Sequence, residues 1–346
     1  MTRIGVCGLK FPEAAELGPE GVLSAAAELG HHGVFFRTIL HMSPELDPGR
    51  LAALRQQADD LDLYLETGLG KVNPFNTAED PSIRELGDGD YLLGARRVIE
   101  AAAAIGCADL WGDTANYQHF RWGLHAIDRF RTDVTWEEQL EATRRLLHRL
   151  APVLRGHGAR INLETHEEIT TFELVRLVED VGPDAVGVTL DLANVVVRGE
   201  DPVEATRRVA PYTRQTHMRD LVVTFTGDGL ERQNRACGDG VVDLAAVLSL
   251  LLEHAPQVNL TIENTKGRDR NGIQIFDRRW QDLHPDLPLA DLAGLVRLAS
   301  VAERRMAAGE LTPVDSYYAP PLGAEWERAF LRRSADHLTT LLSRLT

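Results

Sequence analysis

Four residues of metal-ligating type stand at the ends of four short apolar segments in the second half of the chain. They are Glu164 in INLETH, Asp191 in VTLDLAN, His217 in QTHMRD and Glu263 in LTIENT. Three carboxylates and one imidazole suit Mn²⁺, Mg²⁺, Co²⁺ or Zn²⁺, with coordination positions left for substrate oxygens. The pattern predicts one bound divalent ion, for which we expect Mn²⁺, and proton chemistry beside a carbonyl that the ion polarises.

Each of these acids taken alone could equally cap a helix or pair with an arginine. Three acids and one imidazole at equivalent positions favour a common site, because the carboxyl ends of barrel strands meet at one mouth of the barrel. A buried carboxylate without a compensating charge is also strongly destabilising. The set therefore favours one metal site with four ligands over four residues with independent structural roles.

Other polar residues follow the same strands. His166 lies two residues after Glu164, so it should face the same side of its strand, where an imidazole can act as a base near neutral pH. Arg219 stands in the same relation to His217 and could bind a substrate oxygen or form a salt bridge. Lys71, in the loop after an earlier strand, could bind a sugar hydroxyl or simply be solvated.

Eight short segments rich in β-forming residues alternate with longer segments of helical period. They span residues 3–9, 33–38, 64–70, 108–114, 160–166, 186–192, 214–220 and 259–265. Helix starts are indicated at Asp47-Pro48, Thr135-x-x-Glu138, Thr170-x-x-Glu173, Asp201-Pro202 and Asp243. Eight repeats favour a closed (β/α)8 TIM barrel over a doubly wound sheet. We expect the barrel over residues 1–311 and a C-terminal helical extension over 312–346.

Composition narrows the class of protein. The chain has 346 residues, 44% of them hydrophobic and 26% charged, as in ordinary globular proteins. The net charge of −15 opposes binding to nucleic acid or to an anionic membrane surface. The three cysteines lie far apart, and the sequence shows neither an apolar leader nor an apolar run long enough to cross a membrane. These features predict a cytoplasmic protein. We expect its partner to be a small molecule.

Three further stretches lie at the predicted barrel mouth. Long loops over 71–90 and 115–135 could shape a pocket or contact a partner. Trp111 and Trp122 could stack on a sugar or pack in the core. The basic stretch 266–279 could bind phosphate or be a solvated loop.

The four strand contexts, with HMRD at 217–220 and CGDGVVDL at 237–244, resemble the xylose-isomerase-like TIM-barrel superfamily of sugar isomerases and epimerases. The resemblance spans roughly residues 3–311. It implies that Glu164, Asp191, His217 and Glu263 hold one divalent ion. It also implies that Glu164 and Glu263 are catalytic, on opposite faces of the substrate. Asn194 departs from the epimerase pattern, since those enzymes commonly carry a substrate-binding histidine there, and we assign Asn194 to substrate binding.

A narrower resemblance rests on the E-x-H pair at 164–166, GLGKVNPFN, LGDGDY and DRFRTDVTW. These motifs resemble the large subunit of bacterial C-glycoside deglycosidases. The resemblance implies that another enzyme supplies a 3-oxo-glycoside, from which His166 removes the proton at sugar carbon 2 before the aglycone is eliminated. It also implies a small β-rich partner subunit in a hetero-oligomer.

The favoured prediction is thus a metal-dependent lyase with catalytic His166, Glu164 and Glu263 and with substrate-binding Lys71, Arg219 and Asn194. A keto-sugar isomerase or 3-epimerase would use the same enediolate chemistry and is the second hypothesis. An abasic-site endonuclease shares the fold, but the negative charge opposes it. A metal-free scaffold or binding subunit is the hypothesis from another class.

Overall fold

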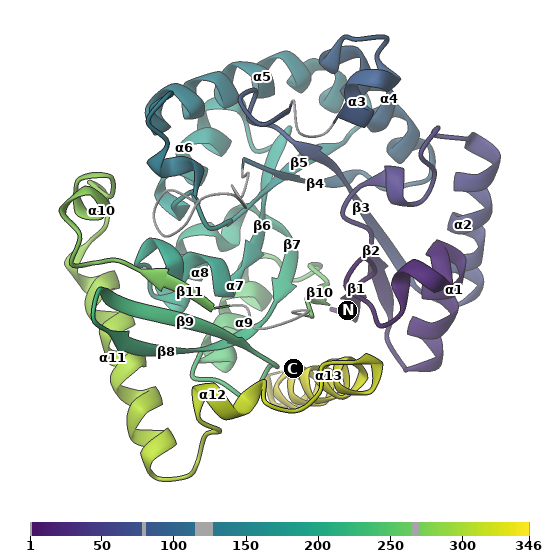
Figure 1. The fold of residues 1–346 in the computed structure, drawn as a ribbon. Helices are drawn as coiled ribbons and strands as arrows, with labels where there is room; N and C mark the ends of the chain where they lie inside the picture. Colours follow the sequence, from purple (N-terminus) through teal and green to yellow (C-terminus); the bar gives the residue numbers. More distant parts are fainter. Residues whose placement is uncertain (1, 78–80, 115–126, 265–269, 346) are drawn as a thin grey trace.

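Eight parallel strands form the centre of the molecule. The computed structural model describes residues 2–77, 81–114, 127–264 and 270–345. The strands close a barrel in the order β1-β10-β7-β6-β5-β4-β3-β2, with helices around it (Figure 1). The predicted TIM barrel is therefore confirmed. The strands are β1 (Ile4–Cys7), β2 (Gly33–Phe35), β3 (Tyr64–Lys71), β4 (Asp109–Asp113), β5 (Arg160–Glu164), β6 (Val186–Asp191), β7 (Thr213–Met218) and β10 (Leu260–Ile262).

Alternation along each strand separates the core from the barrel interior. In β6, Val186, Val188 and Leu190 pack in the main hydrophobic core under the helices. The residues between them face inward, where Thr189 Oγ1 lies 3.2 Å from Gln215 Oε1 of β7. Since side chains alternate with period two, Asp191 faces inward at the carboxyl end of β6.

The helices begin where the sequence predicts them. The side chains of Asp47, Thr135, Thr170, Asp201 and Asp243 each accept a hydrogen bond from the first turn of the following helix. The helices are α1 (Ala14–Glu28), α2 (Pro48–Asp60), α3 (Pro81–Leu86), α4 (Tyr91–Ala104), α5 (Trp136–Gly156), α6 (Thr171–Val181), α7 (Leu192–Val195), α8 (Pro202–Val209), α9 (Leu244–His254), α10 (Arg278–Asp282), α11 (Leu289–Ala307), α12 (Val314–Tyr317) and α13 (Ala324–Leu345).

An antiparallel sheet beside the barrel was not expected. Strand β7 ends at Met218 rather than at residue 220, and Asp220 begins the hairpin of β8 (Asp220–Thr226) and β9 (Gly229–Arg235). Strand β11 (Arg270–Ile273) pairs with β9. The Asp220 carboxylate accepts bonds from the backbone amides of residues 221, 238, 240 and 242, which ties the chain after the hairpin to its start.

The C-terminal helix completes the ring. Helix α13 packs against β1, β10 and α9, while α11 packs on β8 (Figure 1). Phe330, Leu331 and Leu338 of α13 belong to the main hydrophobic core. Helix α13 thus fills the place of the eighth barrel helix, and the domain boundary after residue 311 stays a prediction. Within the described ranges, no helix has the length and apolarity to cross a membrane.

Candidate active site

The four predicted ligands meet at the carboxyl end of the barrel. Glu164 ends β5, Asp191 ends β6, His217 is near the end of β7, and Glu263 directly follows β10. Each offers one ligand atom, and these atoms all lie within 4.8 Å of one another. All four side chains are buried. The structure therefore brings the predicted set together in a geometry that could hold a metal ion.

Cations compensate the buried carboxylates. Lys10 Nζ lies 2.6 Å from Glu263 Oε1, and Arg219 Nη2 lies 3.2 Å from Glu263 Oε2. The Arg219 guanidinium also pairs with both oxygens of Asp191. Burial would raise the pKa of Glu263, but the charges of Arg219 and Lys10 outweigh it and hold that pKa well below its usual range.

The pKa values of the other two carboxylates in the cluster, Glu164 and Asp191, are shifted in opposite directions. His217 Nδ1 lies 2.7 Å from Glu164 Oε1. Burial opposes ionisation of Glu164, but the His217 imidazole outweighs it and lowers the pKa to about 2. At Asp191, burial together with the charges of Glu263 and Glu164 outweighs Arg219 and raises the pKa to about 7. A site with this much negative charge favours an added cation.

A second pair, formed by His166 and Glu168, lies beside the cluster. His166 Nδ1 is 2.7 Å from Glu168 Oε2, and Thr114 Oγ1 donates to Glu168 Oε1 at 2.6 Å. Burial lowers the pKa of His166, but the adjacent Glu168 carboxylate dominates and raises it to about 10. A divalent cation on Glu164 would lower that pKa again, because like charges repel.

The other side of the mouth is apolar. Cys7, Phe35 and Trp111 form a small hydrophobic cluster. The Phe35 ring lies 4.9 Å from the His217 ring, and Trp111 Nε1 donates to Glu164 Oε2 at 3.2 Å. Trp111 therefore supports a predicted ligand as well as lining the site. The other weighed tryptophan, Trp122, lies outside the described residues.

Asn194 and Arg219 are held together by a residue of the unexpected sheet. Asn194 Oδ1 accepts from Arg219 Nη2 at 3.1 Å and from Arg232 Nη1 at 3.2 Å. Arg232 of β9 is fully buried and also pairs with Glu167 at 3.0 Å. The hairpin thus positions two of the predicted substrate-binding residues from outside the barrel.

Lys71 is placed differently from the other predicted residues. Its Nζ lies 3.1 Å from Asp113 Oδ2, and its side chain is largely buried. It is not among the described residues that line the cavity at the barrel mouth. Its assignment to substrate binding therefore stays a prediction without a contact to support it.

These residues enclose a cavity of about 530 Å³. It is lined by Cys7, Leu9, Lys10, Phe35, Arg37, Trp111, Glu164, His166, Glu167, Asn194, His217, Arg219, Glu263, Arg270 and Asn271. Sequence reasoning missed Lys10, Arg37 and Glu168. A charged residue just after each of the first two strands was a usable signal for Lys10 and Arg37. Glu168 had a weaker signal, its spacing of two from His166.

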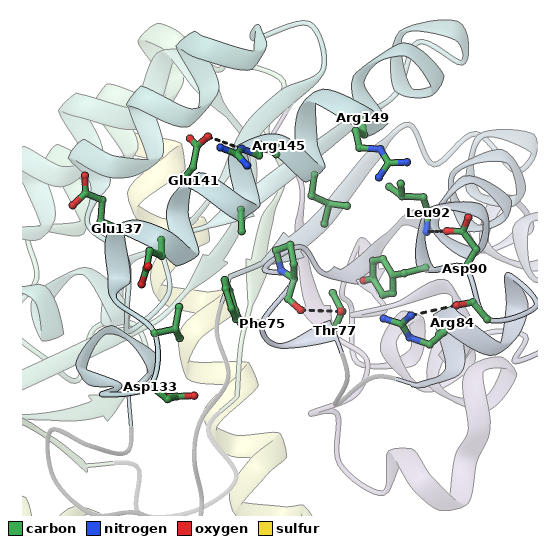
Figure 2. Close-up of a pocket in the computed structure, with 17 residues that line it drawn as sticks. Phe75, Thr77, Arg84, Asp90, Leu92, Asp133, Glu137, Glu141, Arg145 and Arg149 are labelled. Atoms are coloured by element: carbon green, nitrogen blue, oxygen red, sulfur yellow. Dashed lines mark hydrogen bonds and ion pairs between the residues drawn. The ribbon is translucent and has the colours of Figure 1, made fainter.

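A larger hollow of about 1170 Å³ lies elsewhere, between the start of α5 and the segment around α3 and α4 (Figure 2). Its lining includes Phe75, Tyr91 and the exposed pair Glu141–Arg145. The described lining contains no histidine or cysteine. Because none of its charged lining residues is buried, whereas the smaller cavity holds a buried cluster of metal-ligating side chains, the smaller cavity is the candidate active site.

Comparison with known proteins identifies the family. A model described as "Xylose isomerase-like TIM barrel" matches residues 23–282. The chain belongs to this family. The expected superfamily is thereby confirmed. Among solved structures, a xylose isomerase-like TIM barrel protein from Mycobacterium smegmatis, in complex with magnesium, has a TM-score of 0.56 and 19% identity, covering 84% of this chain and 98% of its own.

Other members of the fold act on sugars. The structure of 3-keto-D-glucoside 4-epimerase from Escherichia coli has a TM-score of 0.55 and 15% identity, covering 86% of this chain and 100% of its own. A curated relative, 3-oxo-isoapionate decarboxylase from Pectobacterium atrosepticum, is 24% identical over 72% of this chain and 78% of its own length. The uncharacterized protein YihM from Escherichia coli is 29% identical over 29% of this chain, and that match spans 32% of YihM.

Proposed function

We propose that this protein is a divalent-metal-dependent lyase that removes the proton beside the carbonyl of a 3-oxo-glycoside and eliminates the aglycone. The observation that carries the proposal is the His166–Glu168 pair, which lies in the same cavity as the four-residue cluster. A base oriented by a carboxylate, next to a site that could hold a cation, is the equipment for abstracting a proton from carbon.

The residues fit the ion that the family implies. Glu164, Asp191, His217 and Glu263 supply three hard oxygen donors and one imidazole from four different strands, and they approach within one coordination sphere. We propose Mn²⁺ as the ion, with Mg²⁺, Co²⁺ or Zn²⁺ as alternatives. Such an ion, when bound, polarises a carbonyl and stabilises negative charge on its oxygen.

His166 is the proposed base. Its Nδ1 faces the Glu168 carboxylate, so in the neutral imidazole, the form that a cation on Glu164 would favour, Nδ1–H donates and Nε2 is left to accept a proton. Nε2 takes the proton from sugar carbon 2, and Glu168 stabilises the imidazolium that forms. The electron pair of the broken C–H bond passes into the enediolate. The enediolate then re-forms the carbonyl, and the electron pair from the C–H bond becomes a double bond between carbons 1 and 2. The bond from carbon 1 to the aglycone breaks at the same time, and the aglycone leaves with the electron pair of that bond and takes up a proton from solvent.

Arg219 and Asn194 are the proposed substrate-binding residues at the sugar. Asn194 Oδ1 is engaged by two guanidinium groups, which orients its Nδ2 as a donor. Arg219 lies between Asp191 and Glu263, where its charge stabilises an enediolate oxygen as well as the carboxylates. The 3-oxo-isoapionate decarboxylase relative, whose name denotes a 3-oxo substrate, supports this class of reaction.

The second candidate is a keto-sugar isomerase or 3-epimerase. It is favoured by the placement of Glu164 and Glu263, two carboxylates from β5 and β10 in one cluster, which could accept and return a proton on opposite faces. Elimination and epimerisation share the first proton removal. They differ in whether the enediolate expels a leaving group or is reprotonated.

One experiment separates the two. The Mn²⁺-loaded protein is incubated in D₂O with a 3-oxo-C-glycoside and, separately, with a free ketose, and the products are followed by NMR. Released aglycone supports the lyase. Deuterium incorporation or inversion in the ketose without release supports the isomerase. A small β-rich partner subunit, if required, would restore activity when added. Absence of both metal uptake and turnover would instead support a scaffold.

A further inference from the structure

The cavity wall formed by β2 and β4 carries a cation that the proposed chemistry does not use. We propose that Arg37 recognises a carboxylate on the substrate, so that the natural substrate is an acidic sugar derivative such as a glycuronide. The inference rests on the proposed function for the sugar class of the ligand. It adds the chemical group that distinguishes the substrate from neutral glycosides.

Arg37 is accessible from the cavity. It follows β2, lines the cavity, and its side chain is 42% exposed. Lys10 and Arg219, on the same cavity, are engaged by the carboxylates of the cluster. To the described residues Arg37 instead donates a single hydrogen bond, from Nη2 to Asp113 Oδ2 at 3.1 Å. A guanidinium has five N–H donors, so most of its hydrogen-bonding capacity is left over.

The carboxylate that pairs with Arg37 is shared. Asp113 is fully buried, and the same oxygen, Oδ2, also lies 3.1 Å from Lys71 Nζ. One negative charge divided between two cations compensates each of them incompletely. Burial lowers the pKa of Arg37, but the charges of Asp113, Glu164 and Glu263 outweigh it and raise that pKa, so the guanidinium stays ionised and can pair with an anion on the cavity side.

Trp111 holds this cation in place beside the reaction centre. The guanidinium carbon of Arg37 lies 4.7 Å from the Trp111 ring centroid, which restrains the side chain by a cation–π contact. The indole Nε1 of the same tryptophan donates to Glu164. Trp111 thus lies between Arg37 and the predicted metal ligand Glu164. A sugar ring and its carboxylate substituent could reach both an ion on Glu164 and the Arg37 guanidinium.

A carboxylate fits better than a phosphate. The cavity is also lined by Glu164, Glu167 and Glu263, whose charges repel a phosphate dianion more strongly than a carboxylate. The planar fork of a single arginine matches a planar carboxylate with two parallel hydrogen bonds. We therefore assign one negative charge, not two, to the group that Arg37 binds.

The test measures binding of three probes by calorimetry: D-glucuronate, its uncharged counterpart D-glucuronamide, and D-glucose 6-phosphate. The wild-type protein should bind glucuronate about tenfold or more tightly than glucuronamide. Arg37→Gln should remove the preference, and Arg37→Lys should retain part of it. Arg270→Gln is the matched control, because Arg270 also lines the cavity but pairs with Glu231 and Asp315, and it should keep the preference.

Three results would overturn the assignment. These are equal binding of glucuronate and glucuronamide by the wild type, an unchanged preference in Arg37→Gln, or tighter binding of glucose 6-phosphate. The titrations are repeated with EDTA, since a preference lost on chelation but kept in Arg37→Gln belongs to the ion. Melting curves confirm that the variants fold. Because binding is measured without turnover, failure of the lyase assay and failure of this inference are distinct outcomes.

Discussion

The two ends of the barrel interior hold buried carboxylates in different ways. At the mouth, Glu164 and Glu263 are held by an imidazole and by cations, and their pKa values lie below the usual range. Asp191 of the same cluster is paired with Arg219, although burial and its carboxylate neighbours raise its pKa to about 7. At the opposite end, Glu66 is bound by the neutral groups of Asn259, at 2.8 Å, and Thr261, at 3.5 Å. Burial raises the pKa of Glu66 to about 7.

This difference separates a site for chemistry from a structural network. Three carboxylates that share a buried cluster with charged partners favour an added cation, whereas a single carboxylate that gains proton affinity among neutral partners is stable as a neutral hydrogen-bonding group. The location agrees with a general property of TIM barrels, in which the carboxyl ends of the strands carry function and the amino ends carry stability. Five variants test this contrast.

The largest effect is expected for Glu263→Gln, which keeps the size of the side chain but removes a charged ligand. Bound metal should fall from about one ion per chain to a trace, and turnover should fall about a thousandfold or more. Elemental analysis of the purified variant measures the first and the aglycone assay the second. Full metal content in this variant would show that the four-residue cluster is not the metal site.

His166→Gln should lower kcat by about 10²- to 10⁴-fold while leaving metal content unchanged, because the base is lost but the four ligands remain. Glu168→Gln should give a smaller loss and a shifted pH profile, since Glu168 orients the imidazole and acts through it. Metal loss in His166→Gln would instead make His166 a ligand. An unchanged kcat would make it structural.

Glu66→Gln should change stability rather than activity. The folded pKa of about 7 exceeds the usual glutamate pKa of 4.5, so ionisation of Glu66 lowers the stability of the fold as the pH rises from 4.5 through 7. The variant cannot ionise. Its stability relative to wild type should therefore increase by about 1 to 2 kcal/mol between pH 5 and pH 8, a value reduced for partial solvent access. Urea unfolding at both pH values measures it, and a pH-independent difference would contradict it.

The smallest effect is expected for a substitution outside the barrel interior. Arg145→Gln in the larger hollow removes an exposed pair with Glu141 and should leave turnover, metal content and melting temperature essentially unchanged. This variant is also the control for the other four. A loss of turnover here would give the hollow of Figure 2 a function and weaken the distinction drawn from its lack of buried charged groups.

The sequence predicted the architecture because local signals repeated. Capping residues such as Thr135 and Thr170 mark helix starts through short-range hydrogen bonds, and the alternation in β6 and its neighbours marks strands. The four predicted ligands could be grouped because barrel closure brings strand ends together. Their convergence is a consequence of topology and not of any local contact.

The features that the sequence did not predict depend on contacts between distant segments of the chain. Strand β9, with the sequence GLERQNR, shows no apolar alternation, since Arg232 is buried by pairing with Glu167 across the site. The role of Glu168 depends on Thr114, which lies 54 positions away. Lys71 was placed in the substrate site by its position in a loop, whereas the structure shows it paired with Asp113.

The packing of α13 on β1 has a consequence for synthesis of the chain. Helix α13 and β1 are neighbours, and Phe330, Leu331 and Leu338 of α13 belong to the core that covers the barrel there. A ribosome-bound chain whose α13 is still in the exit tunnel therefore exposes apolar surface along β1 and β10. We expect protease resistance of the nascent chain to rise when α13 emerges, which pulse proteolysis would detect.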